Sequence, residues 1–426
     1  MPLMLSVVMV GVCAMGVHDA PEHGGVKGEA VSAEVLAAES EAEGKSIKGA
    51  VRLTGPELFA KAGEAYFDPY ARWVIFQAVP VGQGEHSSST HYSMYAARLG
   101  KGADGHVKGI DAPVLLSPAG SANTCGFFHP TASYSVIFGS TVRPLGVPEP
   151  KGAGESGGGA GYKRESGSYV WEFPTEMEVC VKTVGEIFKD IVGVEDEGVM
   201  AAAKGLPFPL WNREGYDAEC AYSSDGRNIV YTRVDPETKN PDIYVYNVEF
   251  KTHTPVITRP GYDGGPFFSP DNSHICYRSD PKGDNNLQIF VAELEWDSTG
   301  ALKRVVREKQ VTDNAHVNWA PYWSPTGDYL LYTTSEVGHD NYEVFSIEAP
   351  VGENAEKGAG ELKRRRITHS RGFDGLPVVS KDGKYMMWTS QRPAGAKNTA
   401  LKPGDEGFGG KETSQVWIAD VVDLRP

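Results

Sequence analysis

Short apolar runs alternate with tight-turn signals along most of the chain, and they recur in the same order. One unit reads GYDGGPFFSPDNSHICYRSD at 261–280, in which GPFFS and SHICYRS are runs of strand-forming residues and SPDN is a turn. Proline presets φ in such a turn, and Asn, Asp or Gly tolerates the turn geometry. The pattern therefore predicts pairs of antiparallel strands joined by tight turns.

This unit is repeated through the chain. Clear copies read GYDAECAYSSDGRNIVYTRVD (215–235), HVNWAPYWSPTGDYLLYTTSE (316–336) and GFDGLPVVSKDGKYMMWTSQR (372–392). With two degenerate copies, six units align on the residue that opens the turn, namely Asp68, His129, Ser223, Ser269, Ser324 and Ser380. The shortest spacing, 46 residues from Ser223 to Ser269, matches the roughly 40–45 residues of a four-stranded propeller blade. The sequence predicts an all-β fold, a six-bladed β-propeller.

Further runs complete each blade and suggest how the ring closes. A third strand reads DIYVYNV, LQIFVAEL, YEVFSIEA or QVWIADV, and a fourth ends in TPVIT, KQVT or RRRIT. The last unit shows no fourth strand after QVWIADVVDLRP, whereas IKGAVRLTG (47–55) has the pattern of one. We predict that this N-terminal segment joins the last blade, because closing the ring removes both exposed sheet edges.

The remaining segments read as a leader and as loop insertions. The apolar run from Leu3 to Val17 suits a signal-peptide core, so residues 1–20 are predicted to be a signal peptide. A lipidated Cys13 stays open as an alternative. Residues 21–46, rich in Ala, Glu and Gly, are expected to be a disordered leader or linker. The propeller spans 47–426, with a Gly/Pro-rich insertion at 143–168 and a helical insertion at 186–204.

Charge and cysteine content narrow the class of function. The net charge of −15 argues against nucleic-acid binding, which needs a basic face, and against docking on anionic lipid. No segment is long and apolar enough to predict a membrane span. The cysteines show no CxxC or Cys/His spacing typical of zinc. A disulfide between Cys125 and Cys220, which hold nearly equivalent repeat positions, stays open.

The repeated phrase resembles the WD-like repeats of the TolB-type β-propeller family, in units such as GYDGGPFFSPDNSHICYRS and GFDGLPVVSKDGKYMMWTS. The resemblance covers about residues 47–426. It implies a periplasmic or secreted envelope protein, since the family's namesake binds a peptidoglycan-associated lipoprotein. That namesake carries an α/β domain before its propeller, for which the residues before 47 are too few. Similar repeats occur in oligogalacturonate lyases and propeller-bearing peptidases.

Short polar side chains precede the inner strands, six residues before each turn. In a propeller this position lies at one mouth of the central channel, where five of them would converge: Asn123, Asp217, Asp263, Asn318 and Asp374. Such oxygen donors could hold Ca²⁺ or another divalent ion, contact a partner, or cap turns by bonding the backbone. His316 and Trp319 are predicted beside them as further binding residues.

Two other patterns have a structural or accidental interpretation. The residues that open the third strands are expected to make hydrogen bonds within each blade; they are Ser93, Glu178, Asp242, Gln288, Glu343 and Gln415. GESGG at 154–158 matches a nucleophile elbow only formally, because glycines rather than a strand and a helix flank it. The histidines, His86, His91, His129, His316, His339 and His369, occupy different repeat positions and show no metal-site spacing.

The function expected from the sequence is therefore binding without catalysis or cofactor. We expect a monomeric periplasmic or secreted propeller that binds an envelope protein or peptide through its channel mouth and adjoining loops. Two alternatives stay open: a metal-dependent enzyme on acidic polysaccharide, similar to oligogalacturonate lyase, and a purely structural scaffold.

Overall fold

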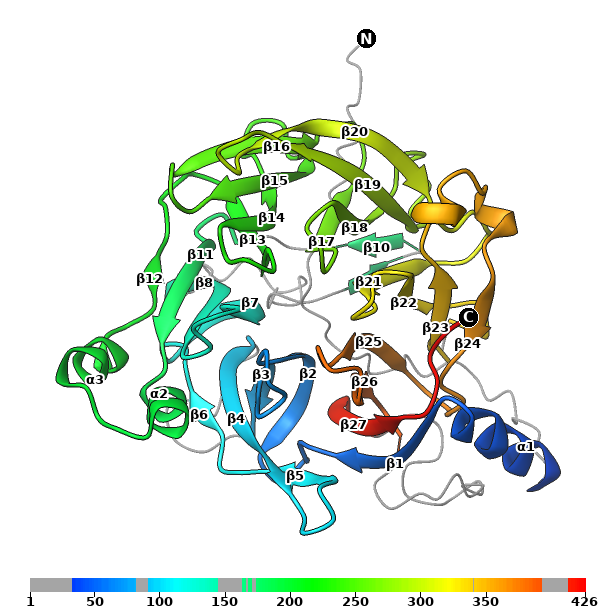
Figure 1. Cartoon of the computed structure of the whole chain (residues 1–426), viewed down its shortest axis with the longest axis horizontal. Coiled ribbons are helices and arrows are strands. Elements are labelled where there is room, and N and C mark those ends of the chain that lie inside the picture. Colours follow the sequence, from blue (N-terminus) through cyan, green and yellow to red (C-terminus); the bar gives the residue numbers. More distant parts are fainter. Residues whose placement is uncertain are drawn as a thin grey trace, which may run out of the picture.

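The computed structural model describes residues 33–81, 91–144, 163–165, 168–170, 174–339, 341–392 and 413–426, and the structural statements apply to these. Six antiparallel sheets stand around one axis like the blades of a propeller (Figure 1). The predicted six-bladed β-propeller is thus confirmed. The predicted signal peptide, Cys13, His86, the GESGG match and most of the 143–168 insertion lie outside the described residues.

The strands of each blade follow one another from the channel outward, apart from β1. The first blade has β2 (Phe59–Phe67), β3 (Trp73–Pro80), β4 (Ser93–Lys101) and β5 (Val107–Ile110), with β6 (Val114–Leu115) also on β4. The second has β7 (Ser121–Phe128), β8 (Ser135–Pro144), β11 (Glu178–Thr183) and β12 (Phe208–Pro209). The third has β13 (Tyr216–Tyr222), β14 (Asn228–Val234), β15 (Pro241–Asn247) and β16 (Thr252–Ile257).

The other three blades have the same arrangement. The fourth has β17 (Asp263–Phe268), β18 (His274–Ser279), β19 (Gln288–Trp296) and β20 (Leu302–Gln310). The fifth has β21 (Asn318–Trp323), β22 (Tyr329–Thr334), β23 (Glu343–Glu348) and β24 (Arg364–Arg366). The sixth has β25 (Asp374–Val379), β26 (Tyr385–Ser390), β27 (Gln415–Val421) and, as its outer strand, β1 (Ile47–Arg52).

Strand β1 closes the ring as predicted. It pairs antiparallel with β27, with Ile47 opposite Val421 and Arg52 opposite Trp417. Ile47 is only 2% exposed and packs in an apolar cluster with side chains of the fifth and sixth blades. The first and last parts of the described chain therefore share one blade, and the ring cannot open without breaking a sheet.

Insertions lie outside the blades. The predicted helical insertion is confirmed as two short helices, α2 (Gly185–Val192) and α3 (Glu197–Lys204). Two 3-10 turns, η2 (Gly352–Asn354) and η3 (Ala359–Glu361), lie between β23 and β24. A separate two-stranded sheet is formed by β9 (Lys163–Glu165) and β10 (Ser168–Val170). In the part of the chain that the structure describes, no helix is long and apolar enough to cross a membrane.

The expectation of a disordered leader is wrong for residues 33–44, which form helix α1 (Ala33–Gly44). The segment AEVLAAESEAEG is rich in Ala, Glu and Leu, which have high helix propensity, but it has no apolar face. The missing face suggested a lack of structure. The helix is instead attached at its last turn through a charged side chain, Glu43, which contacts the sixth blade.

Every inner strand carries a bulge at the same repeat position. The pairing register with the second strand shifts there in all six blades. The bulged residue has a left-handed backbone, with φ between 45° and 60°, and is Glu64, Cys125, Glu219, Gly265, Ala320 or Leu376. Only one of the six is glycine, the residue that adopts this conformation without steric cost. Non-glycine residues there cost about 1–3 kcal/mol each.

The bulges turn main-chain N–H groups across the boundaries between blades. The N–H of Glu64 donates to Thr389 Oγ1 of the sixth blade at 2.9 Å. In the same way the N–H of Leu376 donates to Thr333 Oγ1 of the fifth blade at 3.0 Å. A further bond of this kind joins Gly265 to Thr232. The bulge takes one main-chain N–H out of the strand pairing within its blade. A threonine hydroxyl on the second strand of the neighbouring blade accepts the hydrogen bond from this N–H instead.

Replacing Ile47 by alanine should destabilise the whole ring. The change leaves a cavity in the cluster that joins β1 to the last blade, and such core truncations cost about 2–5 kcal/mol. Lys48→Ala on the same strand is the matched control, because Lys48 is exposed and should change stability by less than about 0.5 kcal/mol. Urea unfolding followed by tryptophan fluorescence measures both. Equal midpoints for the two variants would show that β1 does not help to hold the ring closed.

Candidate functional site at the channel

The acidic residues predicted at the channel mouth are buried where the inner strands begin, and each binds an arginine. The guanidinium–carboxylate pairs and their N–O distances are Asp217–Arg233 (3.0 Å), Asp263–Arg259 (3.0 Å) and Asp374–Arg392 (2.6 Å). Burial raises the pKa of all three carboxyl groups, to about 7 for Asp263, against the attraction of the arginines. Buried charges need such partners, so these contacts are structural. A part in partner binding stays a prediction.

The two asparagines of the predicted ring link neighbouring blades. Asn123 Nδ2 donates to the carbonyl oxygen of Tyr92 in the first blade at 2.9 Å. Asn318 Nδ2 donates to Gln288 Oε1 in the fourth blade at 3.0 Å and to the carbonyl oxygen of His316 at 2.9 Å. His316 thus contributes its main chain here, and its ring is partly exposed. Neither asparagine lines the pocket described below.

The residues that open the third strands also act between blades, which differs from the prediction. Gln288 bonds Asn318 of the next blade, and Gln415 Nε2 donates to the carbonyl oxygen of Phe59 in the first blade at 3.1 Å. Glu343 and Asp242 keep the predicted arrangement, since they accept from the Thr368 hydroxyl and from Asn240 Nδ2 of their own blades. The cause is geometric: each third strand begins beside the next blade's inner strand, where main-chain bonds also cross.

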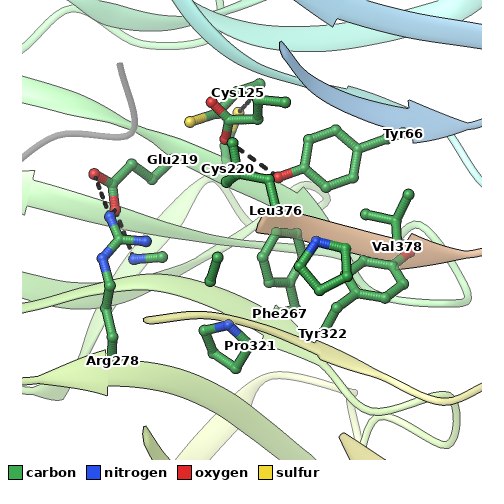
Figure 2. A pocket seen from close by; sticks show the side chains of 14 residues that line it. Tyr66, Cys125, Glu219, Cys220, Phe267, Arg278, Pro321, Tyr322, Leu376 and Val378 are labelled. Atoms are coloured by element: carbon green, nitrogen blue, oxygen red, sulfur yellow. Dashed lines mark hydrogen bonds and ion pairs between the residues drawn. The ribbon is translucent and has the colours of Figure 1, made fainter. Parts of the chain in front are cut away.

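A pocket on the propeller axis is lined by residues of all six blades, among them the six bulged residues (Figure 2). Its cavity volume is about 20 Å³, room for about one water molecule. Its ionisable carboxylates are Glu64 and Glu219, in the first and third blades, and its cation is Arg278 of the fourth. With all three ionised the group carries a formal charge of −1. Sequence reasoning missed these residues, because the bulge position has no common residue type.

Aromatic rings form the inner wall of this pocket. Two residues beyond the bulge, Tyr66, Phe127, Phe267 and Tyr322 meet on the axis, with ring centroids 5.2–6.3 Å apart. Such edge and tilted contacts stabilise aromatic clusters beyond simple burial. The Tyr66 hydroxyl donates to Glu64 Oε1 at 3.2 Å and so joins this layer to the carboxylates. The rings fill the axis, so the pocket opens toward the end where the inner strands begin.

Glu219 is held by several groups of the neighbouring blade. Its carboxylate accepts from the main-chain N–H of Gly265 at 2.6 Å and from Arg278 Nη2 at 3.2 Å. The Tyr262 hydroxyl donates to it at 3.3 Å, and the Arg278 guanidinium lies over the Tyr262 ring. Thr232 of its own blade donates at 3.0 Å. The charge is thus fixed in place and partly balanced at the pocket wall (Figure 2).

A group of aromatic side chains stands beside the pocket at the fifth and sixth blades. Trp319, Tyr342 and Phe373 lie with ring centroids 6.0–6.5 Å apart. Trp319 packs in one cluster with Ala320 and Leu376, which line the pocket. Tyr342 and Phe373 are partly exposed. The predicted binding residue Trp319 is therefore next to the pocket, as the buried member of an aromatic rim.

Cysteine and histidine positions offer no nucleophile or metal cluster among the described residues. The Cys220 thiol lies 3.7 Å from the carbonyl oxygen of Cys125, and burial raises its pKa, so it stays protonated near neutral pH. In the described ranges no three His, Cys, Asp or Glu side chains are placed to hold a metal ion. Burial lowers the pKa of His369 to about 4, helped by Arg366, so that imidazole is neutral.

Comparisons with known proteins give distant structural likeness. No protein-family model and no curated protein matches the sequence. A solved structure described as TolB from Agrobacterium tumefaciens shares 15% identity over 86% of this chain and 91% of its own, with a TM-score of 0.45. TolB from Acinetobacter baumannii shares 12% over 84% and 65%, with a TM-score of 0.46. Oligogalacturonate lyase from Vibrio parahaemolyticus shares 12% over 87% and 92%, with a TM-score of 0.42.

Stability should fall as the pH rises from about 5 to 8, and Glu178 should account for part of the fall. Burial, with a smaller contribution from Asp217, raises the pKa of Glu178 to about 7. A raised pKa means that the folded state binds the proton more tightly than the unfolded state. Stability from this group is therefore present at low pH and lost as the pH rises through about 7, by at most about 1.4 kcal/mol per pH unit.

A comparison of Glu178→Gln with the wild type measures the contribution of the Glu178 carboxyl group to the pH dependence of stability. Glutamine still accepts the hydrogen bond from the Arg213 N–H but carries no charge, so the variant should gain stability relative to wild type between pH 5 and pH 8. Urea unfolding at several pH values measures the difference. Glu176→Gln, at an exposed position two residues earlier, should track the wild type. Parallel curves for Glu178→Gln and wild type would contradict the assignment.

Proposed function

We propose that this protein is a non-catalytic binding module that takes up a protein or peptide partner at the channel mouth. The observation that carries the proposal is the placement of Glu64 and Glu219. Both are buried carboxylates on left-handed backbone, at a position where the fourth blade uses glycine. Burying a carboxylate costs free energy, and a left-handed non-glycine residue adds strain. A role in binding a ligand would explain why the protein bears both of these energetic costs.

The chemistry of the pocket favours a cationic group from the partner. Two carboxylates stand against one guanidinium, Arg278, so a lysine or arginine side chain of the partner would restore the balance of charge. The partly exposed rings of Tyr342 and Phe373, which pack on the buried Trp319, supply faces on which such a cation or an apolar side chain can rest. Arginine and aromatic contacts of this kind dominate binding energy in protein interfaces.

The compartment and the cofactor requirement form part of the same proposal. The apolar run from Leu3 to Val17 supports export, so the partner would be an envelope protein or peptide in the periplasm or outside the cell. A peptide cation would be bound directly by the carboxylates of Glu64 and Glu219, so this proposal requires no metal ion.

A photo-crosslinker at the rim should capture the partner. We would place p-benzoylphenylalanine at Phe373, which is partly exposed at the mouth. The control position is Tyr70, which is 61% exposed in the turn at the opposite end of the β2–β3 pair. Irradiation in an envelope extract of the source cells, followed by mass spectrometry, should give a crosslink from position 373 that position 70 does not give.

The affinity of the purified partner should then depend on Glu64. Glu64→Gln keeps the shape and the Tyr66 contact but removes the charge, and the dissociation constant should rise at least about tenfold. Glu57→Gln, on the exposed loop before β2, is the matched control and should bind as wild type does. Calorimetry measures binding, and a thermal melt confirms folding of each variant. Unchanged affinity in folded Glu64→Gln would refute the site.

Assays on the purified protein distinguish a binding function from a catalytic one. We expect purified protein to contain no stoichiometric divalent ion by mass spectrometry and to release no unsaturated sugar from pectate. A tightly held divalent ion together with such release would overturn the non-catalytic proposal in favour of the polysaccharide enzyme.

A further inference from the structure

Among the side chains of helix α1 that the structure describes, one charged side chain, Glu43, is buried against the propeller. Glu43 is 8% exposed, whereas Val35 is 48% exposed. No described side chain of α1 belongs to the apolar clusters of the described residues. Burial of apolar surface is the main force that holds a helix on a protein. Apart from its link to β1, the helix is therefore held on the sixth blade (Figure 1) mainly by Glu43 among the described side chains.

The Glu43 carboxylate lies in a receptor made by the propeller alone. Arg392 donates to both oxygens, Nη1 to Oε1 at 3.0 Å and Nη2 to Oε2 at 3.1 Å. The main-chain N–H of His369 donates to Oε2 at 2.9 Å. A guanidinium fork with an additional N–H is the strongest common geometry for binding a carboxylate. None of these donors comes from α1, so the helix supplies only the occupant.

The arginine is held in position independently of Glu43. Its Nη2 also donates to Asp374 at 2.6 Å, and its Nε to Ser390 Oγ at 3.2 Å. The guanidinium carbon lies 4.9 Å from the ring centroid of Trp388. These three contacts come from β25 and β26. The receptor is thus preorganised, and its shape does not require the helix.

The donors of the site favour a carboxylate occupant without demanding this one. Burial acts to raise the pKa of Glu43, but Arg392 and the His369 N–H outweigh it and the pKa is lowered. Behind Asp374 lie Glu343 and Arg366, which pair at 2.6 Å, and the neutral ring of His369. Without Glu43 the remaining carboxylates and guanidinium groups are equal in number. An emptied site therefore keeps a balanced charge, and any other carboxylate restores the present state.

We propose that Arg392 and the main-chain N–H of His369 form a carboxylate-binding site at the boundary of the fifth and sixth blades, which Glu43 occupies as an internal ligand and which a glutamate-bearing peptide segment of a partner takes over when α1 detaches. This site goes beyond the proposed channel function, and none of its residues lines the channel pocket. A tethered ligand competes at an effective concentration of the order of millimolar. A partner carboxylate must therefore bind with a dissociation constant below that value.

The first experiment uses the full chain and a labelled peptide. The probe is Ac-AAESEAEGKS-NH2 with a fluorescein label, which copies residues 37–46. Fluorescence anisotropy should show that Glu43→Gln binds it at least about tenfold more tightly than wild type, because the internal competitor is weakened. Glu41→Gln is the matched control on the same helix, since Glu41 is exposed and pairs only with Lys45 among the ion pairs found. It should bind as weakly as wild type.

A second peptide tests the carboxylate itself. Ac-AAESEAQGKS-NH2, with glutamine at the position of Glu43, should bind Glu43→Gln at least about tenfold more weakly than the parent peptide, because it cannot accept the charged fork of Arg392. Equal binding of both peptides, or equal binding of the parent peptide to wild type and Glu43→Gln, would overturn the proposal.

Hydrogen exchange in the wild type avoids dependence on any variant's folding. Excess parent peptide should speed exchange of the α1 amides several-fold while the amides of β25 and β26 stay protected, and the glutamine peptide should not. Unchanged α1 exchange with the parent peptide at saturation would refute displacement. Because these readouts do not involve the channel, their failure leaves the result of the Glu64 experiment unaffected.

Discussion

A left-handed residue in the middle of every inner strand is the constraint on which the rest of the propeller depends. It shifts the register of each inner strand and sends one main-chain N–H toward the preceding blade. It also sets which side chains reach the axis: the bulged residue faces the pocket, and the residue two positions later enters the aromatic layer. The strain of about 1–3 kcal/mol per non-glycine bulge is offset by bonds between blades and by the buried rings.

The same geometry explains the buried polar groups where the inner strands begin. An inner strand begins beside the start of the third strand of the preceding blade, so polar side chains from both are buried there. Asp217, Asp263 and Asp374 therefore take arginine partners, and Asn318 takes Gln288. Removing one member of such a pair costs several kcal/mol. The Asn318–Gln288 bond joins two blades. The Asp217–Arg233 and Asp374–Arg392 pairs each join residues of one blade and hold its inner strand in place.

The fold could be predicted from the sequence because its signals are local and repeated. Turns such as SPDN and the apolar runs around them define two strands of each blade, and the pattern of IKGAVRLTG identified the closing strand that Ile47 begins. The arginine partners could not be predicted in the same way. Arg233, Arg259 and Arg392 occupy different repeat positions, and each pairing depends on the register between strands or blades, which no local pattern encodes.

The bulge escaped prediction for a related reason. Its residues are Glu, Cys, Glu, Gly, Ala and Leu, so composition carries no sign of a shared left-handed backbone. The sequence therefore did not indicate the pocket carboxylates Glu64 and Glu219, and it pointed instead to the position two residues earlier, which is Ala62 in the first blade and Asp217 in the third. Helix α1 was missed because sequence patterns identify helices by an apolar face, and this helix is held by Glu43 instead.

The two proposed binding regions would select opposite charges. The channel pocket sets two carboxylates against Arg278, so it favours a cation. The site of Arg392 and the His369 N–H sets donors toward one carboxylate, so it favours an anion. A formal charge of −15 on the chain weakens long-range approach of acidic partners, and salt reduces this repulsion. An acidic segment therefore needs the short-range fork of Arg392, whereas a cationic segment gains from the field of the whole protein before it reaches the channel.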